Sequence, residues 1–150
     1  MTLEKLTGLY PQFNFIPGDR LHWNAAKSTI TYDKNRSVGE QFAGLLHETA
    51  HGILNHHNFS NDIELITLER DAWSEAKELA KKLKYNLPQD YIDNCMDTYR
   101  DWLYKRAKCP QCALVGIQTG KNAYSCIFCA VDWQVPSSRL CAIRRQLIVK

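Results

Sequence analysis

The chain has 150 residues, a length typical of one modest domain or of a domain with a small appendage. Apolar residues make up 45% of it, enough for a core that needs no disulfide bonds. Residues 1–11 contain an acidic residue and no long apolar run, unlike a secretory signal. No stretch approaches the roughly 18 apolar residues of a transmembrane helix. We therefore expect a cytoplasmic protein without membrane contact.

Charge is distributed unevenly along the chain, although the net charge is only +3. Residues 1–104 carry 11 Lys/Arg against 15 Asp/Glu, a net charge of −4. Residues 105–150 carry 8 Lys/Arg against 1 acidic residue, a net charge of +7. A basic terminal segment on an acidic body predicts an anionic partner, and nucleic acid is the first candidate. A solvated surface without a partner is the alternative.

The first predicted elements are strands. Two β-rich runs at residues 20–24 and 28–33 are joined by Ala25-Ala26-Lys27 and predict a hairpin. Ser37 and Glu40 then form a capping-box pattern, in which each side chain satisfies a backbone N–H of the other residue. This pattern predicts that a helix begins here.

Three helices are predicted in the middle of the chain. In the first, apolar residues recur at helical spacing over 42–54. A polar loop at 58–62 separates it from a second helix that runs to about Tyr85. Pro88 suits the first turn of the third helix. In the tail, residues 136–150, basic and apolar residues are mixed. The sequence is compatible there with either a helix or a strand.

The first predicted helix contains His47-Glu48-Thr49-Ala50-His51. At about 3.6 residues per turn, its two histidines lie on one face, one above the other. Two imidazole nitrogens so placed can bind one zinc ion, at about 2.0–2.1 Å each. Glu48 projects from the adjacent face, where its carboxylate can take a proton from zinc-bound water. The pattern predicts a catalytic zinc with His47 and His51 as ligands and Glu48 as general base. The alternative interpretation is that His47 and His51 are two ordinary surface histidines.

A catalytic zinc takes a third protein ligand, and three side chains are candidates. His57 has the spacing used when the chain turns sharply through a glycine, but Leu54 stands where that glycine would be. Glu69 lies on the following predicted helix, which a helical hairpin would bring to the metal. Asp71, two residues after Glu69 on the same predicted helix, faces a different direction from Glu69. It is better placed to accept a hydrogen bond from a ligand histidine. We expect Glu69 to be the third ligand, with His57 and Asp71 as alternatives.

These motifs resemble those of the ImmA/IrrE-type metallopeptidases. The resemblance covers roughly residues 28–83: a strand, the His-Glu-x-x-His helix and a second short motif. That second motif is matched by Glu69, Ala72, Trp73 and Ala76. The resemblance implies a minimal zincin-like α+β fold, zinc bound by His47, His51 and Glu69, and cleavage of a repressor-type protein. The chain departs from the family pattern at Trp73, where asparagine is common, and by an added ribbon.

Two C-x-x-C pairs, Cys109-Pro-Gln-Cys112 and Cys126-Ile-Phe-Cys129, are separated by 13 residues. Each pair predicts a knuckle that presents two thiolates, and two knuckles close a tetrahedral zinc site. Four sulfurs leave no position for water, so this zinc is expected to be structural, as in a zinc ribbon. Disulfides or redox pairs are the alternative. Cys95 and Cys141 lie outside the pairs and are expected to be small buried hydrophobes.

Basic and aromatic side chains flank the cysteines. The basic ones are Lys105, Arg106, Lys108, Lys121, Arg139, Arg144 and Arg145. The aromatic ones are Tyr124, Phe128 and Trp133. Aromatic stacking in a basic groove is a common way to hold single strands, so the ribbon and tail are the expected site of any DNA contact. Alternatively, the aromatic rings cover the small core of the ribbon.

The predicted architecture is α+β. It consists of a minimal zincin-like domain of β-hairpin and helices at 1–104, a four-cysteine zinc ribbon at 105–135 and a basic tail at 136–150. The edge of the hairpin at 28–33 is expected to align an extended peptide by strand addition. The side chains able to stabilise the oxyanion are His56, His57, Arg70 and Tyr85.

The predicted function is a zinc-dependent endopeptidase with one catalytic and one structural Zn²⁺. Its expected substrate is a protein or peptide, of a regulatory or DNA-associated kind. One alternative is an SprT-like protease, a class that also joins such a helix to a ribbon but uses a third histidine and acts on DNA-linked proteins. The other is a non-catalytic zinc protein that binds nucleic acid or protein. Glu48 argues against the latter, because a structural metal site does not need it.

Overall fold

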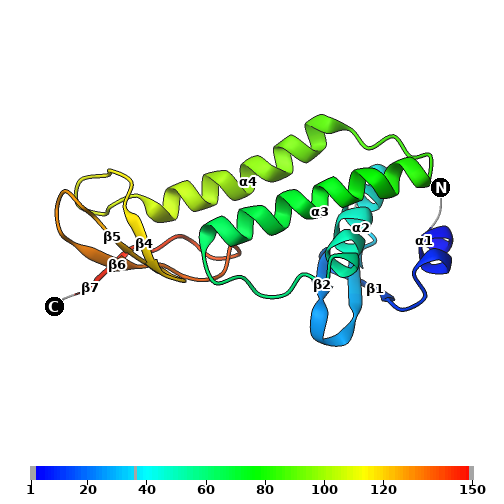
Figure 1. Ribbon diagram of the computed structural model, residues 1–150, viewed down its shortest axis with the longest axis horizontal. Helices are drawn as coiled ribbons and strands as arrows, with labels where there is room; N and C mark the ends of the chain where they lie inside the picture. Colours follow the sequence, from blue (N-terminus) through cyan, green and yellow to red (C-terminus); the bar gives the residue numbers. More distant parts are fainter. Residues whose placement is uncertain (1–2, 36, 149–150) are drawn as a thin grey trace. The chain divides into compact units, whose positions relative to one another are not determined.

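The computed structural model describes residues 3–35 and 37–148, apart from the side chain of Val38. In this part of the chain the protein is α+β, as the sequence predicts. It has four α-helices and two small β-sheets (Figure 1). None of these helices combines the length and the apolar content needed to cross a membrane.

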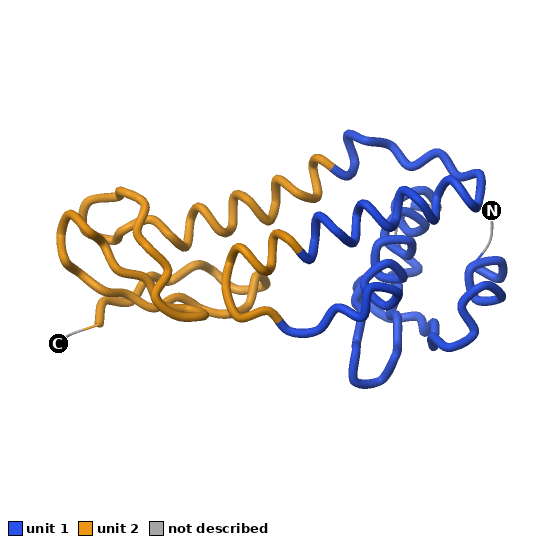
Figure 2. Tube along the Cα trace, in the orientation of Figure 1, with its two compact units in different colours: residues 1–58, 68–92 blue, residues 59–67, 93–150 orange. Residues whose placement is uncertain are grey.

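The chain forms two compact units (Figure 2). Unit 1 consists of Met1–Asn58 and Leu68–Ile92, and unit 2 consists of Phe59–Thr67 and Asp93–Lys150. Each unit combines segments that are separate in the sequence. The segment boundaries predicted at residues 104 and 135 therefore differ from the boundaries of these two units.

Unit 1 contains a three-stranded sheet with the strand order β1-β3-β2. β2 (His22–Asn24) and β3 (Thr29–Asp33) are antiparallel and joined by a 3-10 turn, which confirms the predicted hairpin. β1 (Asn14–Gly18) pairs parallel with β3 and was not predicted. Pro17 makes a strand hard to predict here, because proline has no backbone N–H to donate to a neighbouring strand. It is tolerated on an edge strand, at positions whose N–H would point to solvent.

The strand predicted as a peptide-binding edge is the centre of this sheet. β3 pairs with β1 on one side and with β2 on the other. Its backbone groups are therefore already used, and no extended peptide can add to it. The prediction of strand addition at residues 28–33 is wrong, and the two edges of the sheet belong to β1 and β2.

α2 (Val38–Ile53) begins at the predicted cap. The hydroxyl of Ser37 accepts a hydrogen bond from the backbone N–H of Glu40 at 3.4 Å. The Glu40 carboxylate accepts from that same hydroxyl at 2.7 Å. The Ser37 half of the predicted capping box is therefore present, whereas the Glu40 carboxylate bonds the Ser37 hydroxyl in place of the Ser37 backbone N–H. α1 (Leu3–Leu9), which was not predicted, contributes the fully buried Leu6 to unit 1.

The end of α2 is a Schellman turn, and Asn55 forms it. Asn55 adopts the left-handed conformation with φ of 53°, which asparagine tolerates better than most residues. The N–H of His56 donates to the carbonyl oxygen of His51 at 2.9 Å, and that of Asn55 donates to Gly52 at 3.1 Å. The chain therefore turns sharply one residue after Leu54, and His56 returns toward the last turn of the helix.

The predicted second and third helices are α3 (Asp62–Lys82) and α4 (Gln89–Ala107). α3 ends slightly before the predicted Tyr85, and α4 begins directly after Pro88 as predicted. α4 extends three residues beyond residue 104. Its last turn therefore lies next in sequence to the first cysteine pair.

Unit 2 contains an antiparallel sheet with the order β4-β5-β6-β7. β4 (Ile117–Gly120) and β5 (Ala123–Ser125) lie between the two cysteine pairs, and β6 (Asp132–Gln134) follows the second pair. β7 (Gln146–Ile148) comes from the tail, so the tail contributes a strand to the ribbon sheet. The last two residues of the predicted tail lie outside the described part of the chain.

Two of the three aromatic residues considered for nucleic-acid contact lie in the ribbon core, which confirms for them the alternative that these rings cover that core. Tyr124 and Trp133 are buried and their rings stack with centroids 5.6 Å apart. Arg106 is only 1% exposed, and its guanidinium carbon lies 4.2 Å from the ring centroid of Trp102. These three side chains cannot meet a ligand. Phe128, at 70% exposure, is the one aromatic residue of the predicted set that faces solvent.

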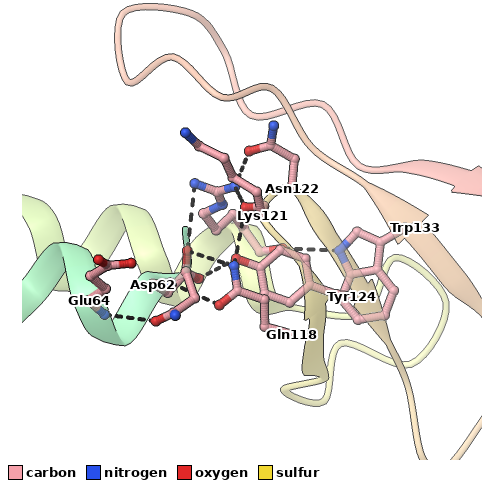
Figure 3. Close-up of polar contacts among 9 residues, drawn as sticks. Asp62, Glu64, Gln118, Lys121, Asn122, Tyr124 and Trp133 are labelled. Atoms are coloured by element: carbon pink, nitrogen blue, oxygen red, sulfur yellow. Dashed lines mark hydrogen bonds and ion pairs between the residues drawn. The ribbon is translucent and has the colours of Figure 1, made fainter. Parts of the chain in front are cut away.

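A polar network joins the start of α3 to the ribbon within unit 2 (Figure 3). The backbone N–H of Asp62 donates to the side-chain oxygen of Gln118 at 2.9 Å. The Asp62 carboxylate accepts from the Tyr124 hydroxyl and lies 3.8 Å from Nη1 of Arg106. Burial, assisted by this carboxylate, raises the pKa of Tyr124, so the hydroxyl remains a donor. The guanidinium also donates to Asn122 Oδ1 at 2.8 Å.

Gly116 allows the ribbon core to close. A Cβ at this position would lie 2.3 Å from the Trp133 ring and 2.7 Å from the carbonyl oxygen of Ser125. Because backbone blocks one side, we expect Gly116→Ala to destabilise the full chain by about 1–3 kcal/mol in chemical denaturation. Gly120→Ala is the matched control, since its Cβ would make only an ordinary 3.6 Å contact. Equal unfolding midpoints for the two variants would contradict this packing.

Candidate metal centres

His47 and His51 on α2 meet Glu69 on α3 in unit 1. Nε2 of His47 lies 3.0 Å from Oε2 of Glu69 and 3.1 Å from Nε2 of His51. Nε2 of His51 lies 3.7 Å from the same carboxylate oxygen. His47 and Glu69 are buried, and His51 is half-buried. Three donor atoms from two helices therefore converge on one point.

These separations are compatible with a metal ion. Tetrahedral coordination with bonds of about 2.0–2.1 Å places ligand atoms about 3.3–3.4 Å apart. The three measured separations, 3.0, 3.1 and 3.7 Å, bracket that value. Two imidazole nitrogens and one carboxylate oxygen are also a donor set that zinc accepts in catalytic sites. The residues predicted as ligands thus form one cluster whose geometry fits a metal.

Electrostatics favour a cation at this point. Burial raises the pKa of Glu69, but hydrogen bonds from the two imidazoles outweigh it and hold the pKa well below its usual range. Burial lowers the pKa of His51, yet the Glu69 carboxylate raises it overall. A buried ionised carboxylate therefore faces two imidazoles, which is an environment that a metal ion would stabilise further.

Two neighbouring side chains orient the imidazoles. Trp73, at 4% exposure, stacks on His47 with ring centroids 4.1 Å apart and an interplanar angle of 23°. Nδ1 of His51 lies 2.9 Å from Nδ1 of His56, so one ring donates to the other and Nε2 of His51 stays directed at the cluster. The carbonyl oxygen of His56 accepts from Trp23 Nε1 at 3.0 Å.

The orienting roles of His56 and Trp73 were not predicted. The sequence named His56 only as an oxyanion candidate and Trp73 only as a departure from a family pattern. Trp73 follows Glu69 by four residues, a spacing that puts both on one face of a helix and was the available signal. For His56 the signal was Asn55, because an asparagine at a helix end predicts the turn that returns the chain.

Glu48 lies beside the cluster without belonging to it. It is half-buried, and its negative charge contributes to the raised pKa of His51. Within the described residues its carboxylate makes no hydrogen bond and no ion pair. The charge of this carboxylate thus reaches His51, and no other described residue engages it.

The alternative residues lie elsewhere. His57 is exposed and is not part of the cluster. Asp71 pairs with Arg70 at 2.8 Å, rather than with a ligand histidine. The Tyr85 hydroxyl donates to the carbonyl oxygen of Gly39 at 3.0 Å. Of the four residues offered as oxyanion donors, His56 is thus the one with a side-chain contact to the cluster among the described residues.

The four cysteines of the two pairs form a second cluster, in unit 2. All four Sγ atoms lie within 4.8 Å of one another, and those of Cys112 and Cys126 are 3.6 Å apart. A tetrahedral zinc with bonds near 2.3 Å would space its sulfurs by about 3.8 Å. A disulfide would need about 2.05 Å, and these cysteines are free thiols. The cluster is therefore compatible with a metal ion.

The two knuckles share one backbone design. In the first, the N–H of Cys109 donates to Leu114 at 2.8 Å and the N–H of Ala113 donates to Cys109 at 3.0 Å. The N–H of Gln111 points at Sγ of Cys109, 3.4 Å away. Residues 126–131 repeat the two backbone bonds, each at 2.9 Å. There the N–H that points at Sγ of Cys126, 3.5 Å away, is that of Cys129. N–H donors of this kind stabilise thiolates, which are the form that binds metal.

The electrostatics of the thiols also favour a cation. Backbone N–H groups of Cys129 and Phe128 lower the pKa of Cys126. A hydrogen bond with the Cys112 sulfur contributes most to raising the pKa of Cys129, followed by burial and by the charge of Cys112. A positive ion at the centre would allow all four groups to ionise.

The two remaining cysteines lie outside this cluster. Cys95 is half-buried, whereas Cys141 is exposed. The Cys141 thiol donates to the carbonyl oxygen of Ser138 at 3.2 Å. The prediction of a buried hydrophobe is therefore wrong for Cys141, because its segment lies on the surface of unit 2 and not in its core.

Comparisons of the chain with protein-family models, with curated proteins and with solved structures find no match. The interpretation of both clusters therefore rests on their geometry and on the chemistry of their donor atoms.

Replacement of Glu69 tests the first cluster. Glu69→Ala removes one of three donors, so we expect the affinity of this site for Zn²⁺ to fall by about 100-fold or more. Competition with a chromophoric chelator would measure it, with circular dichroism to verify folding. His57→Ala is the matched control and should bind zinc like the wild type, because His57 is exposed and outside the cluster. Zinc binding that survives Glu69→Ala but fails in His57→Ala would reverse the assignment.

Proposed function

We propose that this protein is a zinc-dependent endopeptidase with a minimal zincin-like fold, in which His47, His51 and Glu69 hold the catalytic zinc ion. The observation that carries the proposal is the convergence of three donor atoms, two of them on the helix that also carries Glu48, whose carboxylate no other described residue binds. Three protein donors leave the fourth tetrahedral position for water or substrate. The resemblance to the ImmA/IrrE-type motifs agrees with this ligand set.

A zinc ion bound at this cluster would lower the pKa of water to about 7 and polarise the scissile carbonyl. The side chains of the chain do the remaining work. Glu48 accepts the proton of the attacking water and returns it to the leaving amine. Because no hydrogen bond to another described residue competes for its carboxylate, Glu48 is free to move this proton. Trp73 and His56 keep the imidazoles of His47 and His51 directed at one point.

The edge of β2 is the best-supported binding place for an extended substrate. β2 is an edge strand, and its Trp23 bonds to His56, which in turn contacts His51. A peptide added to this edge through backbone hydrogen bonds would lie close to the zinc ligands. β1, the other edge, contains Pro17, which has no N–H to offer. The substrate class, a regulatory or DNA-associated protein, rests on the family resemblance alone.

The four-cysteine cluster is proposed to hold a structural zinc ion, because four sulfurs complete the coordination. The SprT-like alternative is less well supported, since it requires a third histidine and His57 is exposed outside the cluster. A binding protein with a purely structural metal site is also less well supported. Such a site would have no use for Glu48.

Glu48→Gln keeps the shape of the side chain but removes its basicity. We expect zinc content and fold to be unchanged, while the cleavage rate of quenched-fluorescence peptides falls by a factor of roughly 10² or more. Glu78→Gln, which makes the same change at an exposed position of α3, should leave the rate unaltered. Equal rates for the wild type and Glu48→Gln would rule out Glu48 as the general base.

A further inference from the structure

Unit 2 contains a cavity of about 420 Å³ lined by Lys105, Lys108, Ile143 and Arg145. Lys105 lies in the last turn of α4, and Lys108 follows the end of that helix. Arg145 comes from the tail, directly before β7. Two segments that are distant in the sequence thus bring three cations to one cavity, whose lining residues include no acid.

The ribbon fold holds these cations in place. Nη1 of Arg145 donates to the carbonyl oxygen of Lys108 at 3.3 Å, which ties the tail to the end of α4. Ile143 packs against the ribbon core. Lys108 itself forms a β-bridge with Val115. The bridge of Lys108 and the hydrogen bond from Arg145 thus bring the residues that line the cavity together.

Three like charges on one cavity repel, and a bound anion relieves the repulsion. The C-terminal end of α4 offsets only part of this charge, because its partial negative charge is about half an elementary charge. Arg145 contributes a planar fork that matches a phosphate or carboxylate, and the two ammonium groups contribute point charges. The cavity thus has the chemistry of a site for an anionic oxygen group.

The aromatic ring beside the cavity distinguishes between anions. Nζ of Lys108 lies 5.3 Å from the ring centroid of Tyr104, and Tyr104 is 54% exposed. An anionic group next to an exposed flat ring suits a nucleotide, in which a phosphate adjoins a base. A glutamate-rich peptide would satisfy the cations but would have no use for the ring. In a duplex the bases are already stacked, so the ring also favours a single strand.

We propose that this cavity binds a backbone phosphate of a single-stranded nucleic acid and that Tyr104 stacks on a neighbouring base. The site differs from the one suggested by composition, because Arg106, Tyr124 and Trp133 are buried in the ribbon core. It does not depend on the peptidase proposal, since none of its residues belongs to the first metal cluster.

The test is fluorescence anisotropy of the full chain with a labelled oligothymidine and with an abasic strand of equal length, at low salt. The wild type is expected to bind the oligothymidine about 5- to 150-fold more tightly, the range that stacking on one ring provides. Tyr104→Ala should remove this preference, and Tyr104→Phe should retain it. An unchanged preference in Tyr104→Ala would overturn the stacking role.

The cations are tested by Lys105→Glu, since Lys105 makes no hydrogen bond to another described residue whose loss would disturb the fold. We expect both strands to bind about tenfold more weakly and the slope of log K against log salt to become less steep by about 0.7. Lys82→Glu is the control, because it makes the same charge change at an exposed position of α3 in unit 1. Equal losses in the two variants would mean that net charge alone drives binding.

Two further outcomes would overturn the proposal. One is the absence of binding at tens of micromolar wild-type protein. The other is polyglutamate of matched charge competing as well as the oligothymidine, which would assign the cavity to an acidic protein. Circular dichroism and zinc content verify that each variant is folded, and Lys105→Ala replaces Lys105→Glu if the latter does not fold.

Discussion

The ionised carboxylate of Glu69 is the constraint on which the arrangement of unit 1 depends. A buried charge is costly unless it is paired, and here the partners are the two imidazoles of α2 at 3.0 and 3.7 Å. This pairing fixes which face of α3 meets which face of α2. It also brings Trp73, one turn further along α3, onto the ring of His47. The donor atoms are therefore held together by the same contacts that join the two helices.

The two candidate metal centres differ in a way that suits different roles. The first has three donors of mixed type, so a metal bound there would keep a fourth position for water or substrate. The second has four sulfurs on two matching knuckles and no position left for water. Around this second centre the Asp62 network and the buried Arg106 build a small core. A metal there would complete a module too small to be stable from its apolar contacts alone.

Local patterns in the sequence were sufficient for the three longer helices, the two histidines and the four cysteines, because ligands four residues apart on a helix or three apart in a knuckle are set by backbone geometry. Glu69 was expected from a helical hairpin and from the family resemblance, and α1 was not predicted. The pairing of strands that are distant in the sequence could not be predicted from the sequence. β1 was not predicted because Pro17 and Gly18 are unfavourable in strands, although β1 forms a parallel edge strand. β7 was not predicted because this part of the tail becomes a strand only by pairing with β6 in the folded ribbon. Arg106 reads as a surface charge in the sequence, yet the ring of Trp102 and the oxygens of residues 121 and 122 bury it.

The central claim, two metal centres with different donor atoms, is tested most directly by zinc K-edge X-ray absorption on the zinc-loaded full chain. The account predicts two zinc ions per chain, with sulfur neighbours at about 2.3 Å and an equally populated shell of nitrogen and oxygen neighbours at about 2.0–2.1 Å. A single zinc per chain with only a sulfur shell would contradict it, because the cluster of His47, His51 and Glu69 would then bind no zinc.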